Sequence, residues 1–432
     1  MKSQILISDK AKRTTNPIRN IVDNIKPPLN HHKPLFNLAL GDPTIHGNLL
    51  CPQVLTDAIK DSLSLNSSNG YLPSFGSAAA RHAIAKYTSR VGFPEVNEDD
   101  VIIASGCSGA LELVISVLLN EGDDLLVPKP GFPLYQVITN SLGGTVTHYP
   151  LLPSKSWECD TEIMKTLIKP KTKAILINNP SNPCGSNFSV EHLEQIVLIA
   201  KEFHLPIIAD EIYGGCVFDG EFTPIYTIAQ RHEVPVLSVG GLAKEFIVPG
   251  WRVGWITIHD AIQHPRLVDV RGGLKSLTQL IVGANSLIQA ALPRVLTPSG
   301  NELVSLDTFK ERYMAILKNN AKLCVELAKD CPELNVVEAK GAMYTMIHIN
   351  ISSLNNIIDD ADFCRQLLLE ENMFILPGIC FGVTNYVRLV ICPSSDTIRE
   401  AFQRLISFIV SRRQNIGTHN DTENENKKMR IK

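Results

Sequence analysis

The 432-residue sequence predicts an α/β protein with a large domain on a mostly parallel, doubly wound sheet and a smaller α+β domain. From residue 101 to 301, short apolar runs alternate with stretches of helical periodicity. The runs are nearly continuous, as in strands buried on both faces of a sheet. After residue 301 a long helical segment is followed by strands mixed with two helices, which is typical of a separate α+β domain.

The strands of the large domain are expected, in chain order, in VIIAS, DLLVP, GTVTHYP, KAILINNP, LPIIADEIY, VPVLSV and GWITIH. Helices are expected over residues 108–119 and 190–203, where apolar side chains recur three and four residues apart. In such sheets ligands bind at the carboxyl ends of the strands. The loops that follow these runs are therefore the place to look for a site.

The smaller domain is expected to begin with a helix over residues 302–329. The runs LNVVEA, MYTMIHI, FILPG and YVRLVIC follow as strands, with FCRQLLLEE and IREAFQRLISFIV as helices. Residues 36–41 form a further strand candidate that Asp42-Pro43 ends. We divide the chain into an N-terminal arm with a segment of the small domain (1–49), the large domain (50–301), the interdomain helix with the small C-terminal domain (302–410), and a disordered tail (411–432).

Composition argues against several classes of protein. Lys and Arg number 41 against 44 Asp and Glu, a net charge of −3, so no basic field is available to bind nucleic acid. The ten cysteines form no CxxC pair, which disfavours a metal site and a disulfide scaffold and favours a reducing compartment. The apolar stretch near the N-terminus is too short for a signal peptide, and the most apolar window, residues 101–119, contains Glu112 and the polar SGCSG. We expect a cytoplasmic protein without a membrane span.

The strongest local feature is GGLAKEFIVPGWRVGW, which directly follows the strand VPVLSV. Lys244 stands on this loop, where an amine could form a Schiff base; the alternative is an ordinary surface lysine. Arg252 lies between Trp251 and Trp255, where a guanidinium suits an anion such as phosphate. A structural salt bridge is the alternative for Arg252.

Two further charged residues lie in or at the end of apolar strands. Asp210 ends the run LPIIAD, ahead of Tyr213, and a carboxylate there needs a cation or donor, such as a protonated pyridine nitrogen. Capping of the next helix is the alternative. Arg388 stands inside the strand YVRLVIC without an acidic neighbour, so it pairs either with a substrate carboxylate or with a distant Asp or Glu.

Three weaker signals come from strand-end loops. Asn182 of NNPSNPCG either serves a rigid turn or donates its amide to a ring oxygen. Phe132 of PGFPLY either stacks on a flat cofactor or packs in the core. The turn SGCSGA opens a helix whose first backbone N–H groups suit a phosphate, at Ser108, Gly109 and Ala110.

Together these strings resemble the fold-type I pyridoxal-phosphate aminotransferases. IRNIVDNIK, LALGDPT, NGYLPSFG, SGCSGALEL, PGFPLY, LLPSKSWE, NNPSNPCGSNFS, ADEIYGG, GGLAKEFIVPGWRVGW, GAMY and the Arg388 strand occur in the family's order, over residues 8–410. The ordered co-occurrence is far more specific than any single motif.

The resemblance implies a role for each matching residue. Lys244 would hold pyridoxal phosphate (PLP) covalently and move the substrate Cα proton, and Asp210 would pair with the pyridine nitrogen. The ring would contact Asn182, Tyr213 and Phe132. The phosphate would be held by Ser108, Gly109, Ala110 and Arg252, with Tyr71 reaching it from a second subunit of a homodimer whose active sites are shared. The substrate would be bound by Arg388, Gly41 and Asn182.

The resemblance also implies a ping-pong reaction that moves the amino group of L-tyrosine to 2-oxoglutarate, giving 4-hydroxyphenylpyruvate and glutamate, in tyrosine catabolism. One alternative is another PLP enzyme on this scaffold, such as an alanine or broad aromatic aminotransferase or a carbon–sulfur lyase. A cofactor-binding regulator is disfavoured because only about 35 residues precede the first strand, too few for a DNA-binding module. The sequence departs from the family at Gly241, often a serine phosphate ligand, and at Gly215, commonly acidic or bulkier.

Overall fold

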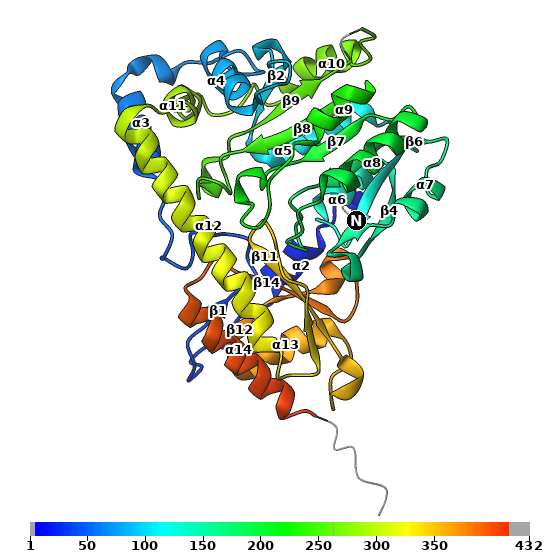
Figure 1. The fold of residues 1–432 in the computed structure, drawn as a ribbon, viewed down its shortest axis with the longest axis vertical. Coiled ribbons are helices and arrows are strands. Elements are labelled where there is room, and N and C mark those ends of the chain that lie inside the picture. The colour runs from blue at the N-terminus through cyan, green and yellow to red at the C-terminus, as the bar shows by residue number, and fades with distance from the viewer. Residues whose placement is uncertain (1–4, 262, 414–432) are drawn as a thin grey trace, which may run out of the picture.

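The computed structural model describes residues 5–261 and 263–413 and confirms the predicted fold class. A large sheet domain and a small domain are joined by the long helix α12 (Gly300–Ala328), which runs between them in Figure 1. The apolar periodicity that predicted a helix over residues 302–329 is that of the face which α12 buries, including Leu306, Leu317 and Cys324.

The large sheet has eight strands in the order β2-β9-β8-β7-β6-β3-β4-β5. Strands β8, β7, β6, β3 and β4 are parallel to one another, while β9 and the short edge strand β5 run antiparallel to their neighbours. All seven expected runs form strands: β2 (Val101–Ala104), β3 (Asp124–Lys129), β4 (Thr145–Leu152), β6 (Thr172–Asn178), β7 (Ile207–Asp210), β8 (Val236–Gly241) and β9 (Gly254–His259), with β5 (Glu158–Cys159) added.

Both faces of this sheet are covered, because successive strand residues point to opposite sides. Leu125 packs with one layer, α5 (Gly106–Leu118), α6 (Leu134–Ser141) and α10 (Val268–Thr278). Its neighbour Leu126 packs with the other layer, α7 (Thr161–Thr166), α8 (Val190–Glu202) and α9 (Ile225–Ala229). A third cluster joins β2 to α3 (Gln53–Ser64), α4 (Ala78–Thr88) and α11 (Ser286–Leu296).

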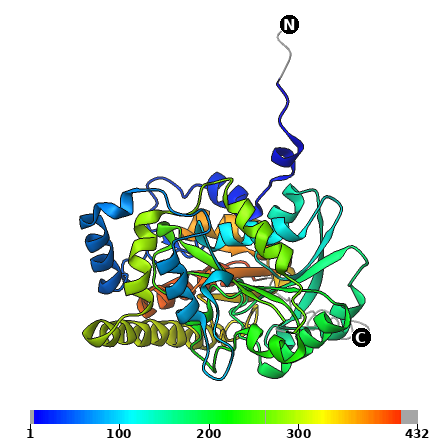
Figure 2. The same ribbon diagram turned by 90° about the horizontal axis from the view of Figure 1, so that it is seen from above.

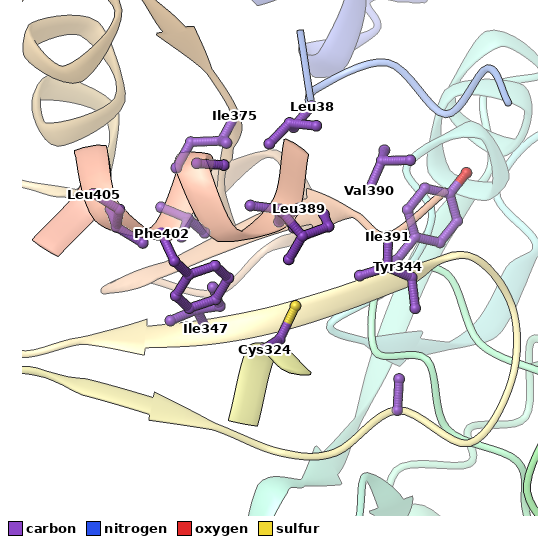
Figure 3. Close-up of a cluster of buried hydrophobic side chains, with 14 of the residues drawn as sticks. Leu38, Cys324, Tyr344, Ile347, Ile375, Leu389, Val390, Ile391, Phe402 and Leu405 are labelled. Carbon is purple, nitrogen blue, oxygen red and sulfur yellow. The ribbon is translucent and has the colours of Figure 1, made fainter. Parts of the chain in front are cut away.

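The small domain has a four-stranded antiparallel sheet in the order β10-β11-β14-β13. Its strands are β10 (Leu334–Val336), β11 (Tyr344–Ile349), β13 (Leu376–Pro377) and β14 (Tyr386–Val390), and its helices are α12, α13 (Asp360–Glu371) and α14 (Ser395–Val410). Figure 3 shows Ile347 and Leu389 of the sheet packed with Phe402 and Leu405 of α14 in the core of this domain.

The N-terminal segment belongs partly to the small domain, as its apolar run predicted. Strand β1 (Phe36–Asn37) pairs in parallel with β12 (Met373–Phe374), and Leu38 accepts a hydrogen bond from the Val390 amide at 3.0 Å. Helix α2 (Pro17–Asn24) packs apolar side chains against the same domain. In Figure 2 the segment before α1 (Asp9–Arg13) leads away from the body of the molecule, whereas α1 itself lies beside α6, with Arg13 paired to Glu121 at 3.2 Å.

At the C-terminal end, the structure describes three residues after α14, Ser411 to Arg413, which belong to the expected tail. Arg413 pairs with Glu333 at 2.7 Å and forms a β-bridge with Leu354, so these contacts tie Ser411 to Arg413 to the small domain. The rest of the expected tail, residues 414–432, lies outside the described residues. Across the two described ranges, no helix combines the length and apolarity needed to cross a lipid bilayer.

Candidate active site

A cavity of about 240 Å³ lies between the two domains, at the carboxyl ends of β7 and β8. Its lining combines residues from the large domain, from the small-domain strands β11 and β14, and from the segment after β1. Nine of the residues selected from the sequence line it: Gly41, Ser108, Phe132, Asn182, Asp210, Tyr213, Lys244, Arg252 and Arg388. The cavity is therefore where the sequence predicted a site, at the strand ends.

Asp210 ends β7 with its side chain 3% exposed. It accepts hydrogen bonds from the Tyr135 hydroxyl at 2.7 Å, the Cys107 thiol at 3.6 Å and the Ile212 amide at 3.3 Å. Desolvation raises the pKa of this carboxyl. None of these donors is a cation, so the carboxylate is set to bind a positively charged group that enters the cavity.

Lys244 stands on the loop after β8, in a helical turn where the Phe246 amide donates to the Leu242 carbonyl at 3.1 Å. Its Nζ atom donates to the carbonyl of Gly41, which belongs to the segment after β1. The side chain lines the same cavity as Asp210 and is not the surface lysine of the alternative interpretation. A primary amine is thus available inside the cavity.

Arg388, in the central part of the small sheet, is 2% exposed. Its Nη1 donates to Asn182 Oδ1 at 2.9 Å and its Nη2 donates to the Ala39 carbonyl, while its Nε finds no hydrogen-bond partner among residues 5–261 and 263–413. The distant Asp or Glu that was the alternative partner is not among these contacts. Burial lowers the pKa of the guanidinium, and a carboxylate that enters the cavity would neutralise its charge.

The Arg388 guanidinium is flanked by aromatic rings. Its central carbon lies 4.3 Å from the centre of the Tyr344 ring and 4.9 Å from that of Phe381. The Tyr344 hydroxyl hydrogen bonds to that of Tyr213 at 2.8 Å. An added Cβ on Gly41 would lie 2.2 Å from the Tyr344 hydroxyl oxygen, so only glycine leaves room for it. The pair joins the two domains inside the cavity.

Arg252 and the start of α5 form the other end of the cavity. Arg252 has a left-handed backbone (φ 53°), and its guanidinium donates to the carbonyls of Pro249 at 3.0 Å and Ser105 at 3.5 Å. These partners are carbonyls, so within the described residues Arg252 does not form the salt bridge of the alternative interpretation. An added Cβ on Gly106 would meet this guanidinium at 2.5 Å. A guanidinium beside a helix N-terminus suits an anion such as phosphate.

The other selected residues differ in how they meet the cavity. Gly109 and Ala110 are in the first turns of α5 but do not line it, and Ala110 is buried. Phe132 lines it and also packs edge-on against Tyr135, with ring centres 5.7 Å apart, so both predicted roles are compatible with its position. Tyr71 is 93% exposed and lies outside the cavity lining.

The lining residues that the sequence did not single out include Cys107, Tyr135 and Tyr344. Each stands inside a motif that was quoted, namely SGCSG, PGFPLY and GAMY, but neither its residue type nor its spacing marked it. Only their contacts with Asp210 and Tyr213 distinguish these residues from core side chains.

The residues present fit PLP. Its pyridine nitrogen is a base that Asp210 can hold protonated, its aldehyde reacts with an amine such as Lys244, and its phosphate matches the anion site at Arg252. The Nε of Arg388 has no hydrogen-bond partner within the described residues, so this guanidinium can also bind a carboxylate. The Cβ of a serine at Gly241 would lie 2.8 Å from the Val253 carbonyl oxygen, so a phosphate ligand at that position does not fit this backbone.

Comparisons with known proteins agree with this geometry. Residues 33–405 match the family Aminotransferase class I and II. A tyrosine aminotransferase of Dictyostelium discoideum is 42% identical over 93% of this chain and 95% of its own length. The human tyrosine aminotransferase is 42% identical over 93% of this chain and 86% of its own. The crystal structure of tyrosine aminotransferase from Leishmania infantum superimposes with a TM-score of 0.89 at 34% identity, covering 96% of this chain and 100% of the other.

Proposed function

Because the chain belongs to the aminotransferase class I and II family, which depends on PLP, we propose that it transfers the amino group of L-tyrosine to 2-oxoglutarate in tyrosine catabolism. The observation that carries the proposal is the convergence of Lys244, Asp210 and Arg388 on one cavity. The products are 4-hydroxyphenylpyruvate and glutamate, formed in two half-reactions. The identity of 42% with proteins named tyrosine aminotransferase supports tyrosine as the amino donor.

The reaction requires a group that stabilises negative charge at the substrate Cα, and bound PLP supplies an electron-poor ring for this purpose. Asp210 would keep the pyridine nitrogen protonated, because none of the groups that hydrogen bond to its buried carboxylate within the described residues is a cation. Asn182 and Tyr213 would hydrogen bond to the ring oxygen, and Phe132 would lie against the ring. Ser108 and Arg252 would hold the phosphate at the start of α5, whereas Gly109 and Ala110 do not line the cavity.

Lys244 would hold the cofactor through its amine and would move the proton of the substrate Cα. Because its Nζ atom lies inside the cavity, it would supply a base of suitable reach beside the ring. Arg388 binds the α-carboxylate with Asn182 and the backbone of Gly41. Both substrates carry an α-carboxylate, which is why one arginine serves both half-reactions.

The remaining lining suits an aromatic side chain. Besides Lys244, Arg252 and Arg388, the described lining holds no Lys or Arg, and much of it is apolar, including Ile18, Leu40, Leu111 and Ile212. A large apolar side chain gains free energy on entering such a pocket, at roughly 25 cal/mol per Å² buried. Tyrosine should therefore be a better donor than aspartate in the first half-reaction.

The decisive assay supplies purified, PLP-loaded protein with tyrosine and each of several 2-oxo acids, including 2-oxoglutarate and pyruvate. Keto acid and glutamate should appear in equal amounts when 2-oxoglutarate is the acceptor. Ammonia released in proportion to tyrosine, without glutamate, would identify a lyase on the same scaffold. A second series with alanine, phenylalanine and methionine as donors tests the alternative of an alanine or broad aromatic aminotransferase.

We also propose a homodimer in which Tyr71 contacts the phosphate bound by the partner subunit. Tyr71 is 93% exposed, and exposed apolar residues mark the surface, including Leu280 (81%) and Ile281 (57%). Mixing inactive Lys244→Ala and Tyr71→Ala chains tests this. Hybrid dimers with one intact site each should restore about a quarter of the normal activity. No recovery after verified exchange would show that the sites are not shared.

We propose that the protein acts in the cytoplasm. All ten cysteines lie in the described residues as free thiols, which suits a reducing compartment. Fractionation of cells that express the protein at its natural level tests this, and recovery in an organelle fraction would contradict it.

A further inference from the structure

The residue next to Lys244 is a buried acid with its own set of partners. Glu245 is 7% exposed. Its Oε2 accepts a hydrogen bond from the Tyr87 hydroxyl of α4 at 2.6 Å, and its Oε1 pairs with Lys310 Nζ of α12 at 2.7 Å. Glu245 does not line the active-site cavity but lines a smaller one of about 70 Å³. Two helices far apart in the chain thus meet on this loop.

Gly215 makes room for this carboxylate. An added Cβ at Gly215 would lie 2.2 Å from Glu245 Cδ and 2.3 Å from Oε2, distances that real contacts do not reach. Its backbone does not need glycine for a positive φ, because Gly215 is not among the positive-φ residues. Space is therefore the reason for glycine here. Gly215 comes two residues after Tyr213, so Glu245 packs directly on the segment that carries that tyrosine.

The position of the Glu245 side chain is held from several sides. Lys310 Nζ lies 5.8 Å from the Tyr87 ring centre and 5.3 Å from that of Phe246, which is the residue after Glu245. A buried carboxylate that lost its partners would be strongly unfavourable. Glu245, Tyr87 and Lys310 should therefore keep one arrangement. We call Glu245, Tyr87, Lys310 and Gly215 the Glu245 anchor.

We propose that the Glu245 anchor positions Lys244, by fixing its loop relative to α4, α12 and the Tyr213 segment. This inference rests on the proposed role of Lys244. Lys244 and Glu245 are consecutive in one helical turn, so a displacement of the Glu245 side chain rotates the turn and moves the Lys244 amine. Glu245 is a positioning residue and touches no reacting atom. A misplacement near 1 Å can cost about 100-fold in rate.

The test uses the PLP-loaded enzyme and a cycle of variants. Glu245→Ala and Gly215→Ala should each lower kcat for tyrosine by about 10- to 100-fold, with KM within about threefold, since Arg388 is unaffected. Glu245→Gln, which keeps the shape and the Tyr87 contact, should lose less. In the Glu245→Ala background, Gly215→Ala should have almost no further effect, because the clashing atoms are gone.

A spectroscopic readout separates positioning from stability. The visible circular dichroism of the bound cofactor reports the geometry at Lys244 and should weaken in Glu245→Ala and Gly215→Ala. The matched control for Lys310→Met is Lys318→Met, also on α12. The Lys318 side chain is 44% exposed and pairs with Asp219 at 3.9 Å. This control should change neither kcat nor the dichroism, whereas Lys310→Met should change both.

Two results would overturn the anchor. The first is an unchanged kcat and dichroism in Glu245→Ala and Gly215→Ala, with only the melting temperature lowered. The second is full additivity of the Glu245→Ala and Gly215→Ala effects, which would make them independent. If Glu245→Ala does not fold, kcat and the dichroism are compared for Glu245→Gln and Gly215→Ala instead. If Lys244→Ala leaves the cofactor spectrum unchanged, the proposed function fails instead, so the two failures are distinguishable.

Discussion

Replacement of Arg388 by methionine should have little effect on the free energy of unfolding and a large effect on kcat/KM. The side chain is 2% exposed, and in the part of the chain that the structure describes its cation has carbonyl partners and two aromatic rings around it but no carboxylate. An unpaired buried charge costs several kcal/mol. Methionine fills a similar volume without that charge, so the folded state without substrate should keep its stability to within about 2 kcal/mol.

The loss in the reaction should be much larger. A bidentate guanidinium–carboxylate contact consists of two charge-assisted hydrogen bonds, each contributing about 1.5–3 kcal/mol. Together they contribute about 3–6 kcal/mol, and each 1.36 kcal/mol is a factor of ten in rate. Arg388→Met should therefore lower kcat/KM by about 10²- to 10⁴-fold. The loss should be similar for tyrosine and phenylalanine, and also for 2-oxoglutarate in the return half-reaction, because all carry the α-carboxylate.

The assays are single half-reactions followed by cofactor absorbance, together with urea unfolding of the protein freed of cofactor. Arg404→Met is the matched control, since Arg404 is 7% exposed in the same domain but bonds to the carbonyls of Pro34 and Glu371 and pairs with Glu400. It should lose stability and keep its kcat/KM. An Arg388→Met enzyme within tenfold of the original kcat/KM would refute a carboxylate-binding role, as would a loss confined to one substrate.

Three further predictions concern groups in and beside the site. Asp210→Ala should lower kcat at least about 100-fold while the fold is kept, because the pyridine nitrogen loses its counter-charge; stopped-flow absorbance measures it. Gly241→Ser should cost about 1–3 kcal/mol of stability without tighter PLP binding, because the Cβ would lie 2.8 Å from the Val253 carbonyl oxygen; urea unfolding and cofactor titration decide this. Burial raises the pKa of Glu211 from 4.5 to about 7, so its contribution to stability is full below about pH 4.5 and is lost as the pH rises through 7. Glu211→Gln should therefore show a smaller fall in unfolding free energy between pH 5 and pH 8 than the unsubstituted chain, and an equal fall would contradict that pKa.

Local patterns predicted the large domain well. The apolar runs predicted the positions of the strands, because a strand buried on both faces needs apolar residues at nearly every position. The bounds of α5 and α8 also lie within two residues of their predicted ends. Predictions for the small domain were right in order but not in detail, since FILPG splits into β12 and β13. These two strands pair with different neighbours, β1 and β14, and no local pattern specifies such partners.

The fold class and the position of Asp210 and Lys244 at strand ends could be predicted from local sequence patterns, because parallel strands bring their carboxyl ends to one edge of the sheet. The sequence could not say whether Arg388 had an acidic partner, since Asn182 and Ala39 are 206 and 349 residues away in the chain. The sequence also did not predict the Tyr213–Tyr344 hydrogen bond or the contact of Glu245 with Gly215. These contacts could be found only in the tertiary structure, because contacts between residues distant in the chain depend on how whole domains pack. The burial that results from this packing determines which charges remain unpaired.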